Sequence, residues 1–127
     1  MTLTYPDGGS LLERFVAART GYAGDGWVAL FAPEAEVHLD PFAAPLAGHN
    51  ALRAYLNEAA EAETEYELTI ERHWVAGDTL LAAWHASWVP AGTRTRVRVA
   101  GFLAAEVRDG AIVRLRHWWN AREPLAG

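Results

Sequence analysis

His117 is the first residue whose type and position suggest chemistry. It lies in the stretch Ala111–Asn120, which follows the turn pair Asp109-Gly110 and alternates in polarity as a β-strand does. Two arginines occupy one face of this stretch, so the opposite face, which carries Val113, Leu115, His117 and Trp119, is predicted to point into the core. An imidazole in that position titrates near neutral pH and can act as a general acid or base.

Asp40 is the second candidate for acid–base chemistry. It precedes Pro41, which favours an extended conformation at Asp40, where a strand predicted over Glu36–Leu39 gives way to a loop. If Asp40 and His117 shared a pocket, desolvation would raise the pKa of the carboxyl and lower that of the imidazole, whereas an ion pair would oppose both shifts. Either arrangement would provide a proton donor or acceptor near neutral pH.

Most other residues predicted to face the interior are large and apolar, and six tryptophans stand in the 127 residues. The expected pocket lining consists of Phe15, Trp27, Tyr55, Trp74, Trp84, Trp88, Leu103 and Trp119. An apolar cavity with one or two polar groups is typical of a small-molecule site. The alternative is a filled aromatic core, in which a backbone carbonyl or Tyr55 satisfies His117.

The remaining histidines do not predict a metal site. His38, His49, His73 and His85 share no predicted face and have neither HxH nor HExxH spacing. With no cysteine in the chain, no thiolate site is available either. We therefore expect no metal and no cofactor.

The elements that position these residues fall into two groups. Ser10 opens a capping box that predicts a helix over 11–20, Asp25 caps a short helix that ends before Pro33, and Asn50 caps a third helix. From Tyr66 onward the hydrophobic period changes to two, and short turn segments separate four predicted strands. Helices followed by a sheet predict an α+β fold, with the helices on one face of a curved antiparallel meander.

Composition limits the function further. The length suits one domain over 1–127, and we expect residues 1–9 to be poorly ordered. A content of 51% hydrophobic and 21% charged residues, without an 18-residue apolar run, predicts a soluble protein and no membrane partner. A net charge of -5 argues against nucleic acid as a partner. The N-terminus has no signal-peptide pattern, and a cytoplasmic location is the default expectation.

Three segments together resemble the SnoaL-like branch of the nuclear-transport-factor-two-like superfamily. They are the helical run 27–35, the helix start 48–56, and the final turn and strand 109–120. The resemblance implies a cone-shaped domain, in which three N-terminal helices pack on a strongly curved, mainly antiparallel sheet that encloses a pocket. It also implies a homodimer, for which Leu81, Ala83, Ser87 and Val89 provide an apolar strip on the outer sheet face.

The superfamily contains isomerases, cyclases, dehydratases, epoxide hydrolases and non-catalytic binders. Asp40-Pro41 resembles the base position of its ketosteroid isomerases, although either Asp40 or Leu39 could face inward, and the donor positions fall on Phe15 and near Leu103, which cannot donate. Asn120 stands where polyketide-cyclase-like members often have an acid. One hypothesis is thus a cofactor-independent isomerase, lyase or cyclase-like hydrolase that transfers protons on a small apolar carbonyl or ring compound. The other is a non-catalytic domain that binds a small apolar or aromatic ligand, or that serves dimerisation.

Overall fold

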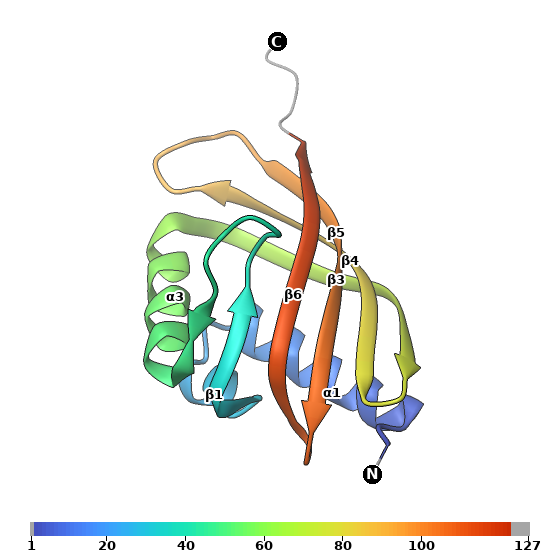
Figure 1. The fold of residues 1–127 in the computed structure, drawn as a ribbon. Coiled ribbons are helices and arrows are strands. Elements are labelled where there is room, and N and C mark those ends of the chain that lie inside the picture. Colours follow the sequence, from blue (N-terminus) through green and yellow to red (C-terminus); the bar gives the residue numbers. More distant parts are fainter. Residues whose placement is uncertain (1, 123–127) are drawn as a thin grey trace.

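The computed structural model describes residues 2–122 and has the predicted α+β architecture. Three helices and six strands follow one another in an order that places the helices mainly in the first half of the chain (Figure 1). The elements are α1 (Tyr5–Thr20), α2 (Gly24–Val28), β1 (Phe31–His38), β2 (Leu46–Ala47), α3 (Gly48–Ala62), β3 (Glu63–Ala76), β4 (Thr79–Pro90), β5 (Val97–Arg108) and β6 (Ala111–Arg122).

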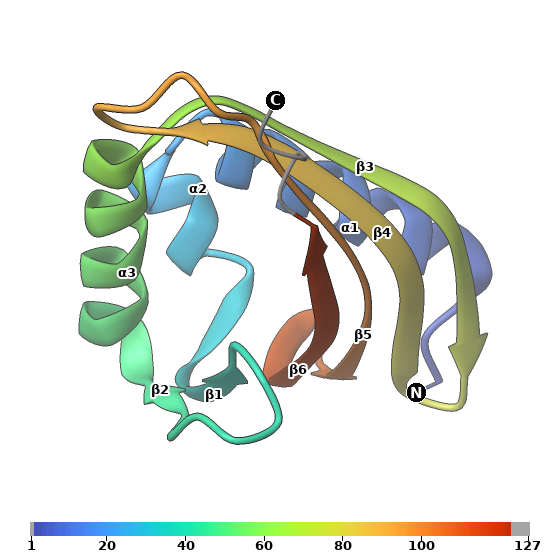
Figure 2. The same ribbon diagram turned by 90° about the horizontal axis from the view of Figure 1, so that it is seen from above.

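All six strands belong to one mixed sheet in the order β2-β1-β6-β5-β4-β3. The pairs from β3 to β6 are antiparallel, as the short turns between them require, and β1 lies parallel to β6. Seen from above, the sheet curves strongly and the helices lie on its concave side (Figure 2). The result is a cone whose wall is the sheet on one side and the helices on the other.

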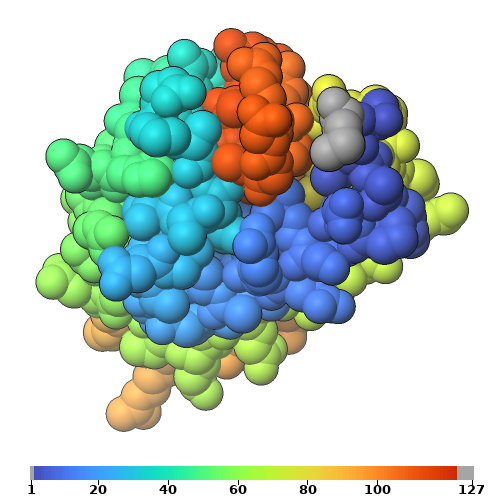
Figure 3. Space-filling view, turned by 90° about the horizontal axis from the view of Figure 1, so that it is seen from below, coloured from blue at the N-terminus to red at the C-terminus, as the bar shows by residue number. Residues whose placement is uncertain are grey.

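The concave side of the sheet and the helices share one hydrophobic core. Leu11 and Phe15 of α1, Leu52 and Leu56 of α3 and Leu103 of β5 are among its buried members. Seen from below, α1 and the segment that follows it form a continuous surface beside β1 (Figure 3). The narrow end of the cone is therefore closed by the N-terminal third of the chain.

Two helix starts differ from the sequence prediction. Helix α1 begins at Tyr5 rather than at residue 11, because Thr4 provides the cap: its hydroxyl accepts a hydrogen bond from the backbone N–H of Asp7, at 3.2 Å. Residues 5–9 are consequently helical. Helix α3 begins at Gly48, two residues before Asn50, and has no side-chain cap. A capping pattern in the sequence marks a residue at which a helix can begin, but it does not exclude a helix that begins earlier.

Helix α2 is shorter and β1 is longer than predicted. The helix ends at Val28, and Pro33 lies within β1 instead of ending a helix. The register between β1 and β6 shifts between Phe31 and Glu36, so Pro33 occupies a stretch where regular pairing is interrupted. Because proline has no N–H to donate, such an irregular stretch is one of the few places in a sheet that accommodates it.

Two β-bulges reverse which side chains of their strands face the core. In β3 the register shifts between Ile70 and Arg72, which turns Trp74 to the outer face, where 37% of its surface is exposed. In β6 the shift leaves Val113 unpaired and places Ile112 in the core. The predictions that Trp74 and Val113 face inward are therefore wrong, because a bulge inserts one residue and reverses the alternation beyond it.

A helix long and apolar enough to cross a membrane does not occur within residues 2–122.

Gly101 permits a close approach of β4 and β6 to β5 on the concave face of the sheet. It lies on the concave face of β5, paired with Trp84 of β4 and Trp119 of β6. A Cβ added there would overlap the carbonyl oxygen of Trp118 and lie 2.8 Å from Trp84 Cζ2 and 2.9 Å from Trp119 Cβ. Glycine in a strand often marks such a close approach.

We expect Gly101→Ala to lower the free energy of unfolding by about 1–3 kcal/mol, the typical cost of forcing extra atoms into a packed site. Gly26→Ala in α2 is the matched control, since the nearest atom to its added Cβ is 3.7 Å away. This control should be neutral or slightly stabilising. Urea unfolding of both variants provides the measurement, and equal stabilities would refute the role given to Gly101.

Candidate functional site

A cavity of about 310 Å³ lies between the concave face of the sheet and the helices. Its size falls at the lower end of the range typical of small-molecule sites. The walls are mainly aromatic and aliphatic. The lining residues are Phe15, Arg19, Trp27, Val37, Leu39, Tyr55, Glu63, Tyr66, Leu68, Trp84, Ala86, Trp88, Val99, Leu103, Leu115, His117 and Trp119.

Seven of the eight residues expected to line a pocket are found in this wall: Phe15, Trp27, Tyr55, Trp84, Trp88, Leu103 and Trp119. The exception is Trp74, which the bulge in β3 turns to the outer face; there it packs against Phe102 with ring centroids 5.8 Å apart. The helical and strand periodicity of the sequence thus indicated which apolar side chains face the cavity, except where a bulge interrupts the sheet.

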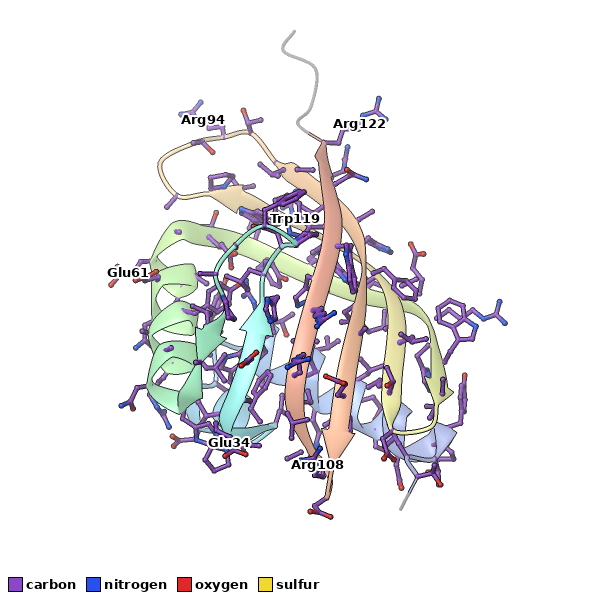
Figure 4. The ribbon with its side chains drawn as sticks, viewed as in Figure 1. Glu34, Glu61, Arg94, Arg108, Trp119 and Arg122 are labelled. Atoms are coloured by element: carbon purple, nitrogen blue, oxygen red, sulfur yellow. The ribbon has the colours of Figure 1, made fainter. Side chains whose placement is uncertain are left out.

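Trp119 forms part of the wall beside the loop between β1 and β2 (Figure 4). Its indole N–H donates a hydrogen bond of 2.7 Å to the carbonyl oxygen of Leu39, which joins β6 to that loop. With 44% of its surface exposed, Trp119 lies partly inside the cavity and partly at the protein surface. The indole therefore occupies the rim.

Asp40 does not line the cavity, and its neighbour Leu39 does. The Asp40 carboxylate instead shapes the loop that follows β1: its Oδ1 accepts hydrogen bonds from the backbone N–H groups of Phe42, at 2.8 Å, and Ala43, at 3.0 Å. Of the two alternatives that the sequence left open, the structure has Leu39 facing inward. It does not bring Asp40 and His117 together in one pocket.

His117 is the lining residue best suited to proton transfer. Its ring packs edge-on against Trp84, with centroids 5.5 Å apart. Burial, and to a lesser degree the positive charge of Arg19, lower the pKa of His117 to about 4. The imidazole is therefore neutral at physiological pH. Ring hydrogen bonds of histidines in the described part of the chain involve His49, His73 and His85, not His117.

An ionic cluster that was not predicted from the sequence lies at the wall, and we call it the Arg19 cluster. It consists of Arg19, Tyr55, Glu63 and Tyr66, which line the cavity, together with Tyr22. Arg19 Nη2 donates to both carboxylate oxygens of Glu63, at 3.1 and 2.9 Å, and the Tyr22 hydroxyl donates to Glu63 Oε1 at 3.1 Å. The Arg19 guanidinium carbon lies 4.1 Å from the ring centroid of Tyr66, and 5.6 and 5.8 Å from those of Tyr55 and Tyr22. Ion pairing and cation–π contacts thus hold one buried cation.

Two members of the Arg19 cluster, Arg19 and Tyr66, have pKa values raised above their usual range. Burial alone lowers the pKa of a guanidinium, but Tyr55 and Glu63 keep the pKa of Arg19 above its usual value. Burial also raises the pKa of the Tyr66 hydroxyl to about 12, although the charge of Arg19 opposes the rise. At neutral pH Arg19 is charged and Tyr66 carries its proton.

Two signals in the sequence could have revealed this cluster. Arg19 stands four residues after Phe15 and eight after Leu11, so it continues the buried stripe of α1. Glu63 belongs to the run of glutamates from 58 to 67, which has the pattern of a solvated helix face, and is the member that lies at the start of β3. A cation on an apolar stripe and an acid at an element boundary are together a better indication of a buried pair than either alone.

Three side-chain nitrogen atoms of the wall are buried without a hydrogen-bond partner in residues 2–122. They are Nη1 of Arg19 and the indole Nε1 atoms of Trp27 and Trp84. All three are donors. All three atoms are fully buried, so they lie behind the surface that lines the cavity.

The comparisons with known proteins agree with this geometry. A family model described as a SnoaL-like domain matches residues 12–115. Comparison of the sequence with curated proteins yields no match.

Several solved structures share the fold. A protein from Catenulispora acidiphila with a ketosteroid isomerase-like fold, in complex with trimethylamine, is 18% identical with a TM-score of 0.78, over 85% of this chain and 83% of that one. The epoxide hydrolase/cyclase-like enzyme SalBIII, with a role in pyran ring formation in the polyether salinomycin, is 19% identical with a TM-score of 0.79, over 89% and 90%. A computationally designed 17-OHP binder is 18% identical with a TM-score of 0.80, over 93% and 98%.

The low pKa of His117 predicts a pH dependence of stability. Between about pH 4 and pH 6.5 the unfolded chain binds a proton at this residue that the folded protein does not bind. The stabilisation is complete above pH 6.5 and is lost as the pH falls toward 4, with a slope of up to about 1.4 kcal/mol per pH unit. Urea unfolding at several pH values measures it.

His117→Gln should flatten that slope, because the variant has no imidazole to protonate. His85→Gln is the control, since His85 is exposed on the outer face and pairs with Glu71 at 2.8 Å. A slope that is the same in wild type and in His117→Gln would contradict the burial of a neutral imidazole in the cavity.

Proposed function

The chain belongs to the SnoaL-like domain family, and we propose that its cone-shaped cavity binds one small, largely apolar molecule. The observation that carries this proposal is a cavity of about 310 Å³ whose wall combines five phenylalanine and tryptophan residues on strands and helices with few polar side chains. The aromatic members Phe15, Trp27, Trp84, Trp88 and Trp119 offer flat apolar surfaces on several sides. A small aromatic or alicyclic compound suits such a wall.

Structural neighbours support the proposal without identifying the ligand. The protein from Catenulispora acidiphila was solved with trimethylamine, and the designed protein binds 17-OHP. Both are less than 25% identical to this chain, so they support only the statement that this fold accommodates small molecules.

A catalytic role is the second candidate, and His117 favours it. The neutral imidazole has one nitrogen that can accept a proton and one that can donate, and it lies in the cavity wall. We propose an isomerase-, cyclase- or dehydratase-type reaction in which His117 transfers a proton on a carbonyl or ring compound. We assign this step to His117 alone, since Asp40 is engaged with the loop after β1 and Asn120 cannot act as a base.

We also propose that two copies of the chain pair through the outer sheet face. Trp74, Phe102 and Trp118 form an outer aromatic cluster, with 37% of Trp74 and 42% of Trp118 exposed. It lies beside the strip of Leu81 and Ala83, which pair with Trp74 and Phe102 across the strands. Large aromatic residues that stay this exposed are typical of an interface. Pairing about a two-fold axis places the outer sheet face of one copy against the same face of the other copy.

Binding of an apolar fluorophore tests the cavity. We expect N-phenyl-1-naphthylamine, which is neutral, to bind at about one site per chain with quenching of tryptophan emission. Ala86→Leu should weaken binding at least tenfold, because Ala86 lines the cavity and the larger side chain fills it. Ala100→Leu, on the exposed face of β5, is the control. Equal binding by both variants would place the fluorophore outside the cavity.

Sedimentation equilibrium at micromolar concentration tests the dimer. We expect a species of twice 13.9 kDa, and Trp118→Lys should shift it toward the monomer, because a lysine opposite its symmetry mate repels it and removes apolar area. Phe42→Lys, on the exposed loop between β1 and β2, should leave the mass unchanged. A wild-type protein that sediments as a single species of 13.9 kDa would exclude the pairing.

A further inference from the structure

The connection between β1 and β2 carries an apolar run, most of which is exposed. The run has no polar side chain and consists of Pro41, Phe42, Ala43, Ala44, Pro45 and Leu46. Phe42 exposes 98% of its surface, whereas the next most exposed large apolar residue within residues 2–122, Tyr5, exposes 59%. A single exposed apolar side chain is ordinary, but an exposed run of several is rare unless it has a function. We call residues 40–45 the Phe42 loop.

The Phe42 loop starts at the rim of the cavity. Leu39, the residue before it, lines the cavity, and its carbonyl oxygen accepts the 2.7 Å hydrogen bond from the Trp119 indole. Trp119 lies beside this loop, with 44% of its surface exposed (Figure 4). Phe42 follows Leu39 by three residues, and three residues span at most about 11 Å. The Phe42 ring is therefore within reach of the cavity mouth without any movement of β1.

The Phe42 loop is attached to the fold mainly at its base. The carboxylate of Asp40 accepts hydrogen bonds from the backbone N–H groups of Phe42 and Ala43, at 2.8 and 3.0 Å, so these bonds lie within the loop. In the described part of the chain, residues 40–45 make no hydrogen bond to another element. Beyond the loop, β2 is an edge strand that pairs with β1 through Leu46 and Ala47. The turn that carries Phe42 can consequently rotate as a compact unit while the sheet keeps its hydrogen bonds.

We propose that the Phe42 loop closes over an apolar ligand, so that Phe42 covers the mouth of the cavity and becomes part of the binding site. The inference rests on the proposed function, because only a bound ligand gives the ring a partner. Over an empty mouth the ring would face a void and gain few contacts. Over an apolar ligand it would remove apolar surface of both ring and ligand from water. The ligand therefore shifts the loop from the open conformation to the closed one.

The small area of the loop favours a small molecule over a second protein as its partner. A stable protein interface buries about 800 Å² on each side, contributed by about 20–30 residues. The Phe42 loop is a short segment with one aromatic side chain, Phe42. A ligand that needs a cover at one end of the cavity matches this area.

Limited proteolysis of the wild-type protein tests the closure. Chymotrypsin cleaves after exposed aromatic residues, so the open loop should be cut between Phe42 and Ala43, whereas the proline after Tyr5 protects that bond. We expect saturating N-phenyl-1-naphthylamine to slow cleavage after Phe42 about tenfold, because the closed loop shields this residue from the protease. A small peptide substrate, digested at the same fluorophore concentration, corrects for direct inhibition of chymotrypsin.

Trypsin cleavage after Arg94 is the control for this experiment, since Arg94 lies in the exposed segment between β4 and β5. The fluorophore should not change the rate at this bond. Equal slowing at Arg94 and Phe42 would mean that the ligand stabilises the whole fold, and it would overturn the closure. An unchanged rate at Phe42 in the presence of bound fluorophore would overturn it as well.

Dissociation rates separate this inference from the proposed function. We expect Phe42→Ser to release N-phenyl-1-naphthylamine about tenfold faster than wild type in stopped-flow experiments, because the mouth then stays open. Tyr5→Ser, which removes an exposed ring at the start of α1, is the matched control and should have the wild-type rate. No binding to the wild-type protein would contradict the pocket itself. Binding with equal dissociation rates in wild type and Phe42→Ser would leave the pocket intact and overturn the closure.

The closure makes Asp40 a positioning residue, because its carboxylate shapes the turn that carries Phe42. Asp40→Ala removes both hydrogen bonds and should speed dissociation of the fluorophore by about the same factor as Phe42→Ser. Asp40→Asn should restore the wild-type rate, since the amide oxygen can accept the same two N–H groups. Equal dissociation rates in the alanine and asparagine variants would overturn the positioning role of Asp40.

Discussion

The burial of one guanidinium group at the wall of a cavity is the constraint on which the rest of this structure depends. Arg19 at the end of α1 reaches its partner Glu63 at the start of β3, and tyrosines from three further places surround it. A charge in such a place is tolerated only if it is paired and hydrogen-bonded, and removing one partner of a buried pair typically costs about 3–5 kcal/mol. The pair therefore fixes α1 against the first long strand of the sheet.

The curvature of the sheet and the Arg19 cluster together create a cavity instead of a filled core. Gly101 leaves room for Trp84 and Trp119 on the concave face of the curved sheet, and the helices close the opposite side. The same enclosure explains the neutral His117, because both burial and the nearby charge of Arg19 disfavour a second cation in the wall. Packing and electrostatics thus act on one site: an apolar space that holds one ion pair and one neutral base.

The sequence predicted the α+β class, the strand order of the meander and most of the apolar wall, because helical and strand periodicity depend on local pattern alone. The prediction from sequence failed where the structure depends on contacts between residues that are far apart in the chain. The bulges in β3 and β6 depend on the register with neighbouring strands, and they reversed the faces of Trp74 and Val113. The Arg19–Glu63 pair was missed because 44 residues separate its members, and each looks like a solvated charge when considered alone. Asp40 and Leu39 could not be distinguished, since the Pro41 step permits either to face inward.

A crystal structure of the protein with bound N-phenyl-1-naphthylamine tests the central claim most directly, because it shows whether the cavity is the binding site. We expect the aromatic rings of the ligand inside the cavity, between walls that include Trp84 and Trp119. A ligand bound on the outer surface, with the cavity empty, would contradict the claim that the cavity is a small-molecule site.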